Sequence, residues 1–476
     1  MFFNSYYYLL FFTSVFFLYW FILKKNHKAQ NAFLLFTSYF FYSCWDYRFL
    51  GLLVFSTLLD FFTGFKIEKA STETNRKNWL RLSVGINVGL LGVFKYYDFF
   101  AESFSSILHK AGVHHNPYLL KIILPVGISF YTFHGLSYVL DIYKRKIKAE
   151  INFVDYSLFV SFFPLLVAGP IERAAHLLPQ IKNIRQFNYL HATNGLRQIL
   201  WGLFKKVVVA DNCAQYVDAV FPNYAEASSI QLITAAILFA FQIYGDFSGY
   251  SDMALGSAKL LGFDLLRNFS FPYFSRDIAE FWRRWHISLS SWFRDYIYIP
   301  MGGNQNGKFS AIKNTCFIFL LSGFWHGANW TFIFWGMLNA MFFLPLLLTN
   351  KHRVHLGVIA EGKILPSFNE LFHVIFTFSL TTFAWIFFRS DSLSSAIGYV
   401  QAIATSRGSI EQLSASYSVV SIIVLLIFEW YNRQIEVPFL AIRNKKIRLT
   451  AYILITVLIF FMGAFINPRS FIYFQF

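Results

Sequence analysis

The sequence has 476 residues, of which 56% are hydrophobic and 14% are charged. A water-soluble domain could not bury that much apolar surface, so the composition excludes a soluble protein. The net charge of +16 comes from short Lys and Arg clusters between apolar stretches, which argues against nucleic-acid binding. The three cysteines have neither a CxxC pair nor zinc-ligand spacing, and we expect no metal site.

The first apolar stretch, residues 5–23, is long enough to cross a hydrocarbon core of roughly 30 Å as a helix. No basic residue precedes it and it lacks a small-residue cleavage site, which argues against a signal peptide. Lys24, Lys25 and Lys28 come directly after it. Since basic loops stay in the cytoplasm, we expect a retained first helix with the N-terminus outside.

Further crossings follow, separated by loops whose basic residues return to the cytoplasmic side. We expect these crossings at residues 31–43, 49–64, 83–99 and 119–142. Residues 154–170 are apolar but short and bounded by Pro and Gly. This pattern favours a re-entrant segment packed within protein.

An apolar stretch is interrupted at residues 244–252, which hold Asp246 and Asp252 among Gly and Ser. The interruption predicts a broken helix beside a polar cavity. The two acids could bind an ion or orient Arg and His partners, and structural pairing is the interpretation we favour. Between residues 264 and 310 the hydropathy falls, and aromatic residues recur at helical spacing. This pattern predicts a helix lying at the membrane interface.

The last crossings are the clearest, at residues 371–388 and 449–466. Basic residues at 443–448 precede the final crossing, so we expect the C-terminus outside. The prediction is an all-α integral membrane protein with about 10–12 crossings, re-entrant segments and interfacial helices. We expect it to form a single domain over residues 1–476.

Ionisable side chains inside apolar stretches are costly to bury and are therefore functional candidates. His326 lies between two glycines, which would let a ligand or another helix approach the backbone. His286 lies four residues after Trp282, which would place both on one helical face. For His134, a third intramembrane histidine, we favour a structural role. The chain has no GxSxG, Walker A or HExxH motif, which leaves hydrolase, ATPase and zinc-protease functions without support.

Several short motifs occur in order along the chain. They are PVGISF (Pro125–Phe130), DFSGYSD (Asp246–Asp252), WRRWHISLS (Trp282–Ser290), IPMGGN (Ile299–Asn304) and WHG (Trp325–Gly327). Each is weak alone, but together they resemble the membrane-bound O-acyltransferase (MBOAT) family, in its bacterial alginate O-acetylation branch. The resemblance implies the fold of that family, with a tunnel joining the two faces of the membrane. It makes His326 the counterpart of the family's central histidine and His286 the upstream polar residue that assists.

The resemblance also implies that acetyl coenzyme A is the acyl donor, entering from the cytoplasm as a substrate and not as a permanently bound cofactor. A histidine suits this reaction, because a neutral imidazole with a pKa of about 6.5 can remove a hydroxyl proton during attack on a thioester. Arg and Lys side chains between residues 267 and 308 could meet the phosphates of the donor.

The C-terminal residues 471–476 are similar to the Phe-x-Tyr-x-x-Phe acyl-transfer motif of bacterial extracellular O-acylation systems. The tyrosine of that motif is implied to carry the acyl group, which makes Tyr473 a candidate nucleophile. An aromatic anchor at the membrane interface is the alternative. This branch works with a separate extracytoplasmic serine O-acetyltransferase of the SGNH type, which we expect as the partner.

The expected location is the bacterial inner (cytoplasmic) membrane, with membrane lipid around a multi-pass chain. Within the family, D-alanyl transfer to teichoic acid is the alternative function. From another class, a secondary transporter would be favoured by internal inverted symmetry, and we find none in the sequence. The acceptor, whether peptidoglycan, alginate, cellulose or another glycan, is left open.

Overall fold

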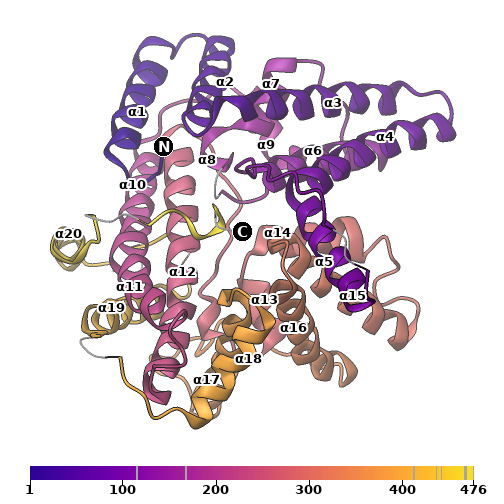
Figure 1. Cartoon of the computed structure of the whole chain (residues 1–476). Helices are drawn as coiled ribbons and strands as arrows, with labels where there is room; N and C mark the ends of the chain where they lie inside the picture. The colour runs from indigo at the N-terminus through magenta and orange to yellow at the C-terminus, as the bar shows by residue number, and fades with distance from the viewer. Residues whose placement is uncertain are drawn as a thin grey trace. The chain divides into compact units, whose positions relative to one another are not determined.

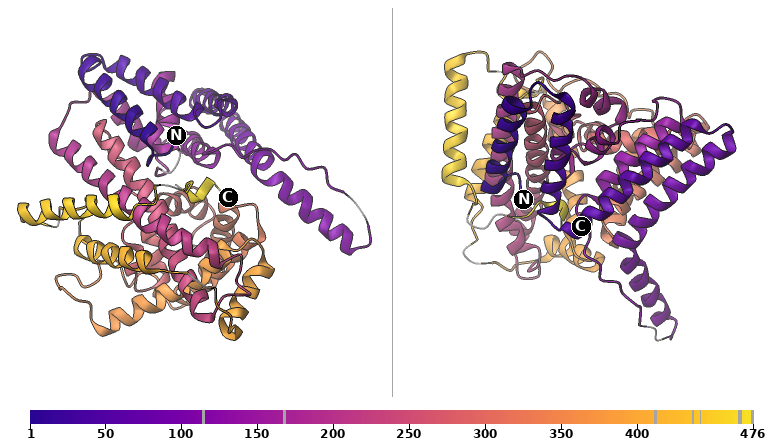
Figure 2. Two further views of the ribbon diagram at one scale, coloured as in Figure 1. Left: turned by 60° about the vertical axis from the view of Figure 1, so that its left-hand side comes forward. Right: turned by 90° about the horizontal axis from the view of Figure 1, so that it is seen from above.

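The chain folds into helices in two compact units, shown in Figures 1 and 2. Unit 1 comprises residues 1–189 and 258–266, and unit 2 comprises residues 190–257 and 267–476. The described residues contain no β-strand, which confirms the all-α class. The computed structural model describes residues 1–113, 116–166, 169–410, 413–435, 437–440, 442–465 and 469–474.

Unit 1 is built around α3, which packs against both α4 and α6. Figure 1 shows α3 and α4 side by side. Asp60 on α3 is buried there and accepts hydrogen bonds from Ser83 (2.6 Å) and Asn87 (2.9 Å). The helices are α1 (Tyr6–Phe17), α2 (His27–Ser43), α3 (Leu50–Lys69), α4 (Glu73–Leu91), α5 (Tyr97–Lys110), α6 (Ile128–Tyr143), α7 (Phe153–Ser161), α8 (Phe163–Leu166) and α9 (Ala174–Lys182).

Two predicted segments of unit 1 differ in detail from the structure. The crossing expected at 119–142 is helical only from Ile128, because Pro125 lacks an N–H and Gly127 takes a left-handed conformation (φ 74°). Residues 154–170 form the short helices α7 and α8, which are buried and separated at Phe162. Val167 and Ala168 lie outside the described residues.

Unit 2 contains the remaining helices, of which α15 and α16 form an extensively packed pair. Helices α19 and α20 both pack against η4, a π-helical turn that follows α10 (Figure 2). The elements are α10 (Tyr189–Leu203), η4 (Phe204–Ala210), α11 (Asp211–Val220), α12 (Ser229–Leu260), η5 (Pro272–Phe274), α13 (Ile278–Arg284), α14 (Ile287–Phe293), η6 (Arg294–Tyr298), α15 (Gly307–His326), α16 (Trp330–Leu348), α17 (Phe368–Arg389), α18 (Leu393–Thr405), α19 (Ser416–Asn432), α20 (Lys445–Met462) and η7 (Ile472–Phe474).

Helix α12 corrects the prediction of a broken helix at 244–252, because it runs unbroken through that segment. Its acids are neutralised by ion pairs across the bundle, Asp246 with Lys206 (2.7 Å) and Asp252 with Lys205 (2.6 Å). A buried carboxylate paired in this way needs no break in the helix to reach water. The favoured interpretation, structural pairing, is therefore confirmed, with lysines as the partners.

The single interfacial helix expected between 264 and 310 is also wrong. Two short helices, α13 and α14, meet at His286, which has a left-handed backbone (φ 43°). The break is held from a distance, because the Ile287 N–H donates to the carbonyl oxygen of Asn268 (2.8 Å) and the Asn268 side chain accepts from Ser288 (2.6 Å). The aromatic stripe, represented by Trp285, is buried in unit 2 and does not lie at a surface. His286 therefore does not share a helical face with Trp282.

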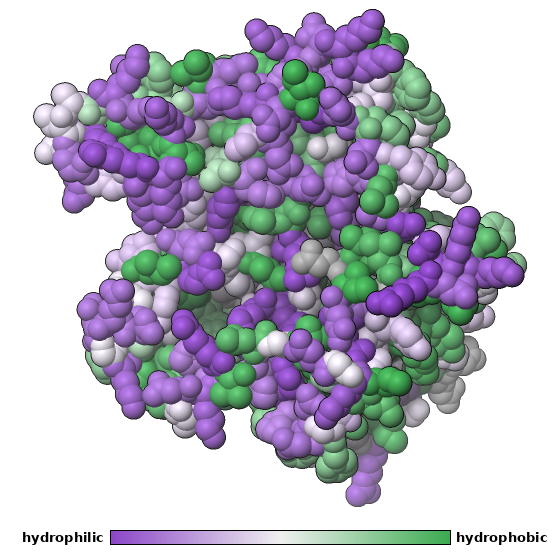
Figure 3. Space-filling view, turned by 180° about the vertical axis from the view of Figure 1, so that it is seen from behind, coloured by the Kyte–Doolittle hydropathy of each residue, from purple (hydrophilic) through white to green (hydrophobic). Residues whose placement is uncertain are grey.

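Four helices within the described residues are long and apolar enough to cross a membrane. They are Tyr47–Lys69, Ser229–Leu260, Trp330–Leu348 and Phe368–Arg389. Large apolar side chains remain exposed on the helices, including Phe372 and Phe376 on α17 and Phe460 on α20, as lipid-facing residues do. By contrast, hydrophilic residues predominate on the face drawn in Figure 3. The number of crossings, about 10–12, stays a prediction.

Candidate active site

His326 is the last residue of α15, and close packing against α16 fixes the backbone that leads to it. A Cβ atom on Gly323 would lie 2.2 Å from the carbonyl oxygen of Phe332, and one on Gly336 would lie 2.4 Å from that of Phe319. No larger residue fits at either position without moving a helix. The space beside Gly323 is therefore taken by a helix and not by a ligand.

Aromatic rings enclose the imidazole of His326, which is buried. The ring centroids of Trp325, Trp335 and Phe388 lie 5.0, 5.1 and 5.3 Å from it. Trp325 also lies 5.8 Å from the ring of His286, so one indole contacts both histidines. An environment of this kind has a low dielectric, in which a proton-transferring group interacts strongly with any charge that develops nearby.

His286 lies at the junction of α13 and α14, where the left-handed backbone turns its side chain into unit 2. The side chain is buried against Phe247, with ring centroids 4.7 Å apart. Within the part of the chain that the structure describes, neither ring nitrogen has a hydrogen-bond partner. An unsatisfied buried imidazole costs free energy, so it requires a functional explanation.

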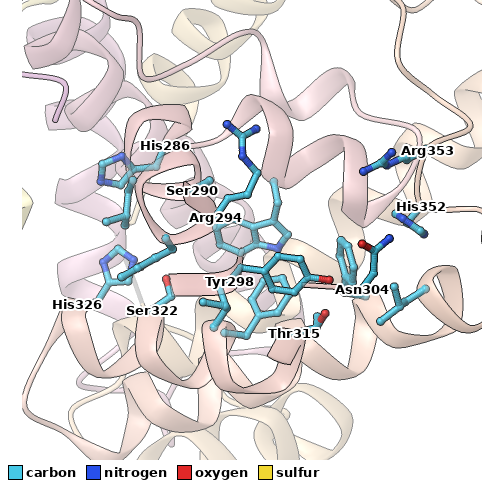
Figure 4. A pocket seen from close by; sticks show the side chains of 17 residues that line it. His286, Ser290, Arg294, Tyr298, Asn304, Thr315, Ser322, His326, His352 and Arg353 are labelled. Atoms are coloured by element: carbon cyan, nitrogen blue, oxygen red, sulfur yellow. The ribbon is translucent and has the colours of Figure 1, made fainter. Parts of the chain in front are cut away.

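A cavity of about 260 Å³ brings His286 and His326 to one end of a shared space. Figure 4 shows the two imidazoles at that end and Asn304, His352 and Arg353 at the other. The stretch between the ends is mainly apolar and aromatic, and no lining residue is acidic. The lining residues are Trp282, His286, Leu289, Ser290, Phe293, Arg294, Tyr298, Asn304, Thr315, Ile318, Phe319, Ser322, His326, Phe343, Leu347, His352 and Arg353.

The C-terminal tail enters unit 2 and reaches the same histidines. The ring of Tyr473 lies 5.6 Å from that of His326 and 4.7 Å from that of Phe247. The protein encloses its hydroxyl group, and the neighbouring Phe471 is fully buried. Gln475 and Phe476, the end of the predicted motif, lie outside the described residues.

The structure thus brings together the three residues selected from the sequence: His286, His326 and Tyr473. His134 belongs to unit 1 and has a structural environment, as expected. Its Nδ1 lies 3.4 Å from the carbonyl oxygen of Val160, and its Nε2 accepts a hydrogen bond from the Glu172 N–H (3.1 Å). Within the described residues, no group of three or more His, Cys, Asp or Glu side chains could hold a metal ion.

The basic residues expected to meet the donor divide into two groups. Arg276 and Arg284 are occupied by ion pairs with Glu280, and Arg283 donates to backbone carbonyl groups. Arg294 lines the cavity and also pairs with the neighbouring Asp295 (2.8 Å), a contact in which the arginine side chain is exposed.

Two basic residues that line the cavity, His352 and Arg353, were not among the candidates selected from the sequence. The signal available was the short basic run Lys351–Arg353 at the end of the apolar stretch that forms α16. That run looks like any other cytoplasmic loop.

Comparison with known proteins gives bacterial relatives whose names all describe the transfer of an acyl group. The chain is 37% identical over 399 residues to the peptidoglycan O-acetyltransferase of Helicobacter pylori, which covers 78% of this chain and 73% of that protein. It is 37% identical over 423 residues to the "Probable alginate O-acetylase AlgI" of Pseudomonas aeruginosa, which covers 86% of this chain and 78% of that protein. A more distant relative is the teichoic acid D-alanyltransferase of Streptococcus thermophilus, 29% identical over 45% of this chain and 55% of that protein.

Residues 143–387, more than half of the chain, match the MBOAT family, described as membrane-bound O-acyltransferases. This region contains His286, His326 and the other residues that line the cavity. The match also agrees with the apolar helices of both units. The chain therefore belongs to the membrane-bound O-acyltransferase family and is an acyltransferase of the membrane.

Proposed function

We propose that this acyltransferase accepts an acetyl group from acetyl coenzyme A on the cytoplasmic side and delivers it, through an ester on Tyr473, for O-acetylation of an extracytoplasmic polysaccharide. The observation that carries the proposal is the position of the Tyr473 ring, 5.6 Å from the ring of His326 at the end of the cavity. A donor thioester, a base and an acceptor hydroxyl could meet there.

The cavity suits the pantetheine arm of a coenzyme A thioester. Its apolar walls fit a narrow, largely uncharged chain, and the cationic side chain of Arg353 is placed to meet phosphates at the end away from His286 and His326. His352 and Asn304 add polar groups at the same end (Figure 4). The positive-inside rule assigns this basic end to the cytoplasm.

The reaction is a transfer of acetyl from sulfur to oxygen. His326 removes the phenolic proton as the oxygen of Tyr473 attacks the carbonyl carbon of the thioester. The carbon–sulfur bond then breaks, and the thiolate of coenzyme A that leaves takes this proton from the imidazolium of His326. A phenol with a pKa of about 10 is a poor nucleophile until it loses that proton, so a positioned imidazole is needed. The ring N–H of His286 could donate to the thioester carbonyl oxygen and stabilise the negative charge that develops there.

The second transfer takes place outside the membrane. An aryl acetate remains activated because its leaving group is a stabilised phenolate, so a serine hydroxyl of a separate SGNH-type O-acetyltransferase could accept the acetyl group. With both termini extracytoplasmic, the tail would leave the bundle on the side where the polysaccharide lies. The printed names of the relatives, peptidoglycan and alginate acetylating proteins, support a polysaccharide as the final acceptor.

Two alternatives are weaker. D-alanyl transfer would bring an ammonium group into the cavity, and none of the lining residues is an acid that could pair with it. Family membership makes the chain an acyltransferase and removes the reason for proposing a secondary transporter.

The test is to incubate purified protein with acetyl coenzyme A carrying a labelled acetyl group and to find the label by mass analysis of the C-terminal peptide. We expect one acetyl group on Tyr473, removable by hydroxylamine, and none in a Tyr473→Phe variant. Tyr452→Phe, which removes a hydroxyl that accepts a hydrogen bond from Arg197, is the matched control and should retain the label. If acetyl coenzyme A were consumed and the labelled acetyl group appeared in other products but never on the C-terminal peptide, the tyrosine intermediate would be refuted.

A further inference from the structure

Two neighbouring lysines on η4 each pair with an acid on α12. Lys205 contacts Asp252 (2.6 Å) and Lys206 contacts Asp246 (2.7 Å), and both lysine side chains are buried. The two pairs are alike in chemistry and come from the same two elements. They differ in what else they bind.

Close packing of the two backbones brings these lysines to α12. A Cβ atom on Gly249 would lie 2.7 Å from the carbonyl oxygen of Gly202, and one on Gly245 would lie 2.9 Å from that of Lys205. The glycines of the DFSGYSD region therefore serve helix packing. Both lysine side chains are buried there and pair with the acids of α12.

The Lys206–Asp246 pair also binds the backbone of the C-terminal tail. The Ile472 N–H donates to Oδ2 of Asp246 (2.6 Å), and the Lys206 ammonium group donates to the carbonyl oxygen of Arg469 (3.1 Å). Asp252 of the other pair accepts from Gln198 instead (3.0 Å). Figure 1 shows the tail (yellow) running back from α20 across α12 to this place.

We propose that Lys206 and Asp246 form a latch that seats the tail and places Tyr473 at His326, so that both act as positioning residues for acetyl transfer. This proposal rests on the proposed role of Tyr473. Hydrogen bonds between charged side chains and backbone groups are strong in an apolar interior, and two of them hold the tail, together with the ion pair between Arg469 and Asp218 (2.6 Å).

The latch fixes the tyrosine because the contacts are adjacent in sequence. Ile472, whose N–H is held, directly precedes Tyr473. On the other side, Phe471 packs between Phe247 and Tyr250 of α12, with ring centroids 5.8 and 4.7 Å away. One side of α12 therefore supplies both the latch and the aromatic seat of the tail.

The latch can open without leaving a buried charge unpaired. If the tail departs, Lys206 still contacts Asp246 and also Asp211 (2.8 Å). A cavity of about 540 Å³, lined by Asp211 and Arg469 among others, lies beside the tail and gives it room to move. Reversible seating of this kind is what a carrier that must leave and return requires.

The latch is tested by accessibility, which does not depend on catalysis. In protein whose native cysteines are replaced by alanine, Tyr473→Cys puts a thiol, close to the backbone, at the position whose native side chain ends in an enclosed hydroxyl. We expect slow reaction with a membrane-impermeant maleimide, and a rate at least about tenfold higher when Asp246→Asn is added, as loss of one charge-assisted hydrogen bond allows. Asp252→Asn is the matched control and should leave the rate unchanged. If Asp246→Asn and Asp252→Asn gave equal rates of maleimide labelling, the latch would be overturned.

A second pair of variants keeps the test valid if Asp246→Asn does not fold. Ile472→Pro removes the N–H that Asp246 binds, at the first position of η7 where proline is tolerated, and Ile472→Ala also shortens the side chain but retains the N–H. We expect faster labelling with Ile472→Pro than with Ile472→Ala on the Tyr473→Cys background. Equal labelling of these two variants would also count against the latch.

Native-tyrosine versions of the same variants separate the two proposals. The latch and the tyrosine intermediate together predict that Asp246→Asn lowers acetylation of Tyr473 at least about tenfold while the KM for acetyl coenzyme A stays the same, because the donor cavity is untouched. Faster labelling with no tyrosine acetylation in any protein would support the latch and refute the tyrosine intermediate. Lower acetylation with unchanged labelling would refute the latch alone.

Discussion

His134 in unit 1 and His286 in unit 2 are both buried, and their surroundings differ in hydrogen bonding. Both ring nitrogens of His134 face backbone groups, the carbonyl oxygen of Val160 and the N–H of Glu172. Neither nitrogen of His286 has such a partner among the described residues, and His286 lines a cavity together with His326. The difference teaches that burial alone does not separate the two histidines, and that the unpaired nitrogens beside a cavity make His286 the candidate for a role in the proposed reaction.

Substitution of His326 should have the largest effect on activity, and substitution of His134 the smallest. We expect His326→Ala to lower the rate of acetyl transfer by about 10²- to 10⁴-fold, the range for loss of a general base, with little change in the unfolding temperature. Turnover of labelled acetyl coenzyme A by monodisperse protein measures the effect, here and for the variants below, with the second transferase and its polysaccharide supplied so that the tyrosine is unloaded after each transfer. A folded variant with near wild-type turnover would place His326 with His134 as a structural residue.

His286 should give a smaller loss of activity. His286→Asn is the suitable substitution, because asparagine tolerates the left-handed backbone at this position and removes only the imidazole. We expect roughly a tenfold fall in kcat, with KM little changed, if the imidazole stabilises the reacting thioester. Steady-state kinetics at several donor concentrations distinguish this outcome from a binding defect, which would raise KM instead.

Arg353 tests the open end of the cavity, where the contacts are exposed to water. We expect Arg353→Ala to raise the KM for acetyl coenzyme A about two- to fivefold and to leave kcat unchanged, since exposed charge pairs contribute little. The increase should shrink at high salt. Lys351→Ala removes a neighbouring charge that does not line the cavity and should leave KM unchanged.

His134 should show no catalytic effect per folded molecule. His134→Ala leaves the buried N–H of Glu172 without an acceptor, which costs roughly 1–3 kcal/mol of stability. We therefore expect a lower unfolding temperature and a normal kcat in the protein that remains folded. Loss of kcat in stable His134→Ala protein would contradict the division between the two histidines.

His286, His326 and Tyr473 could be selected from the sequence because each lies in a short motif of consecutive residues. Helix content and the long apolar helices also follow from local composition, as α17 illustrates. The break at His286 could not be predicted, because the spacing of the aromatic residues continues across it. The turn is held by Asn268, which lies outside both helices and belongs to no local sequence pattern with them.

The unbroken α12 was missed for a related reason. Two acids in an apolar stretch indicate a break only if nothing neutralises them, and their partners Lys205 and Lys206 lie on another element. Lys205 and Lys206 come shortly after α10 and belong to no recognisable motif. Nothing in the local sequence therefore connects Lys206 with the tail at residue 472. Long-range pairing of this kind is visible only in three dimensions.

Under the proposed mechanism, the attachment of Tyr473 to the same polypeptide has a kinetic consequence. A nucleophile tethered beside its base has a very high effective concentration, so the first transfer needs no acceptor in solution. Each chain, however, has one such hydroxyl group in its tail site and can hold one acetyl group at a time. Without the second transferase, donor consumption should therefore stop after a burst equal in amount to the protein, and the burst height would count the active molecules in a preparation.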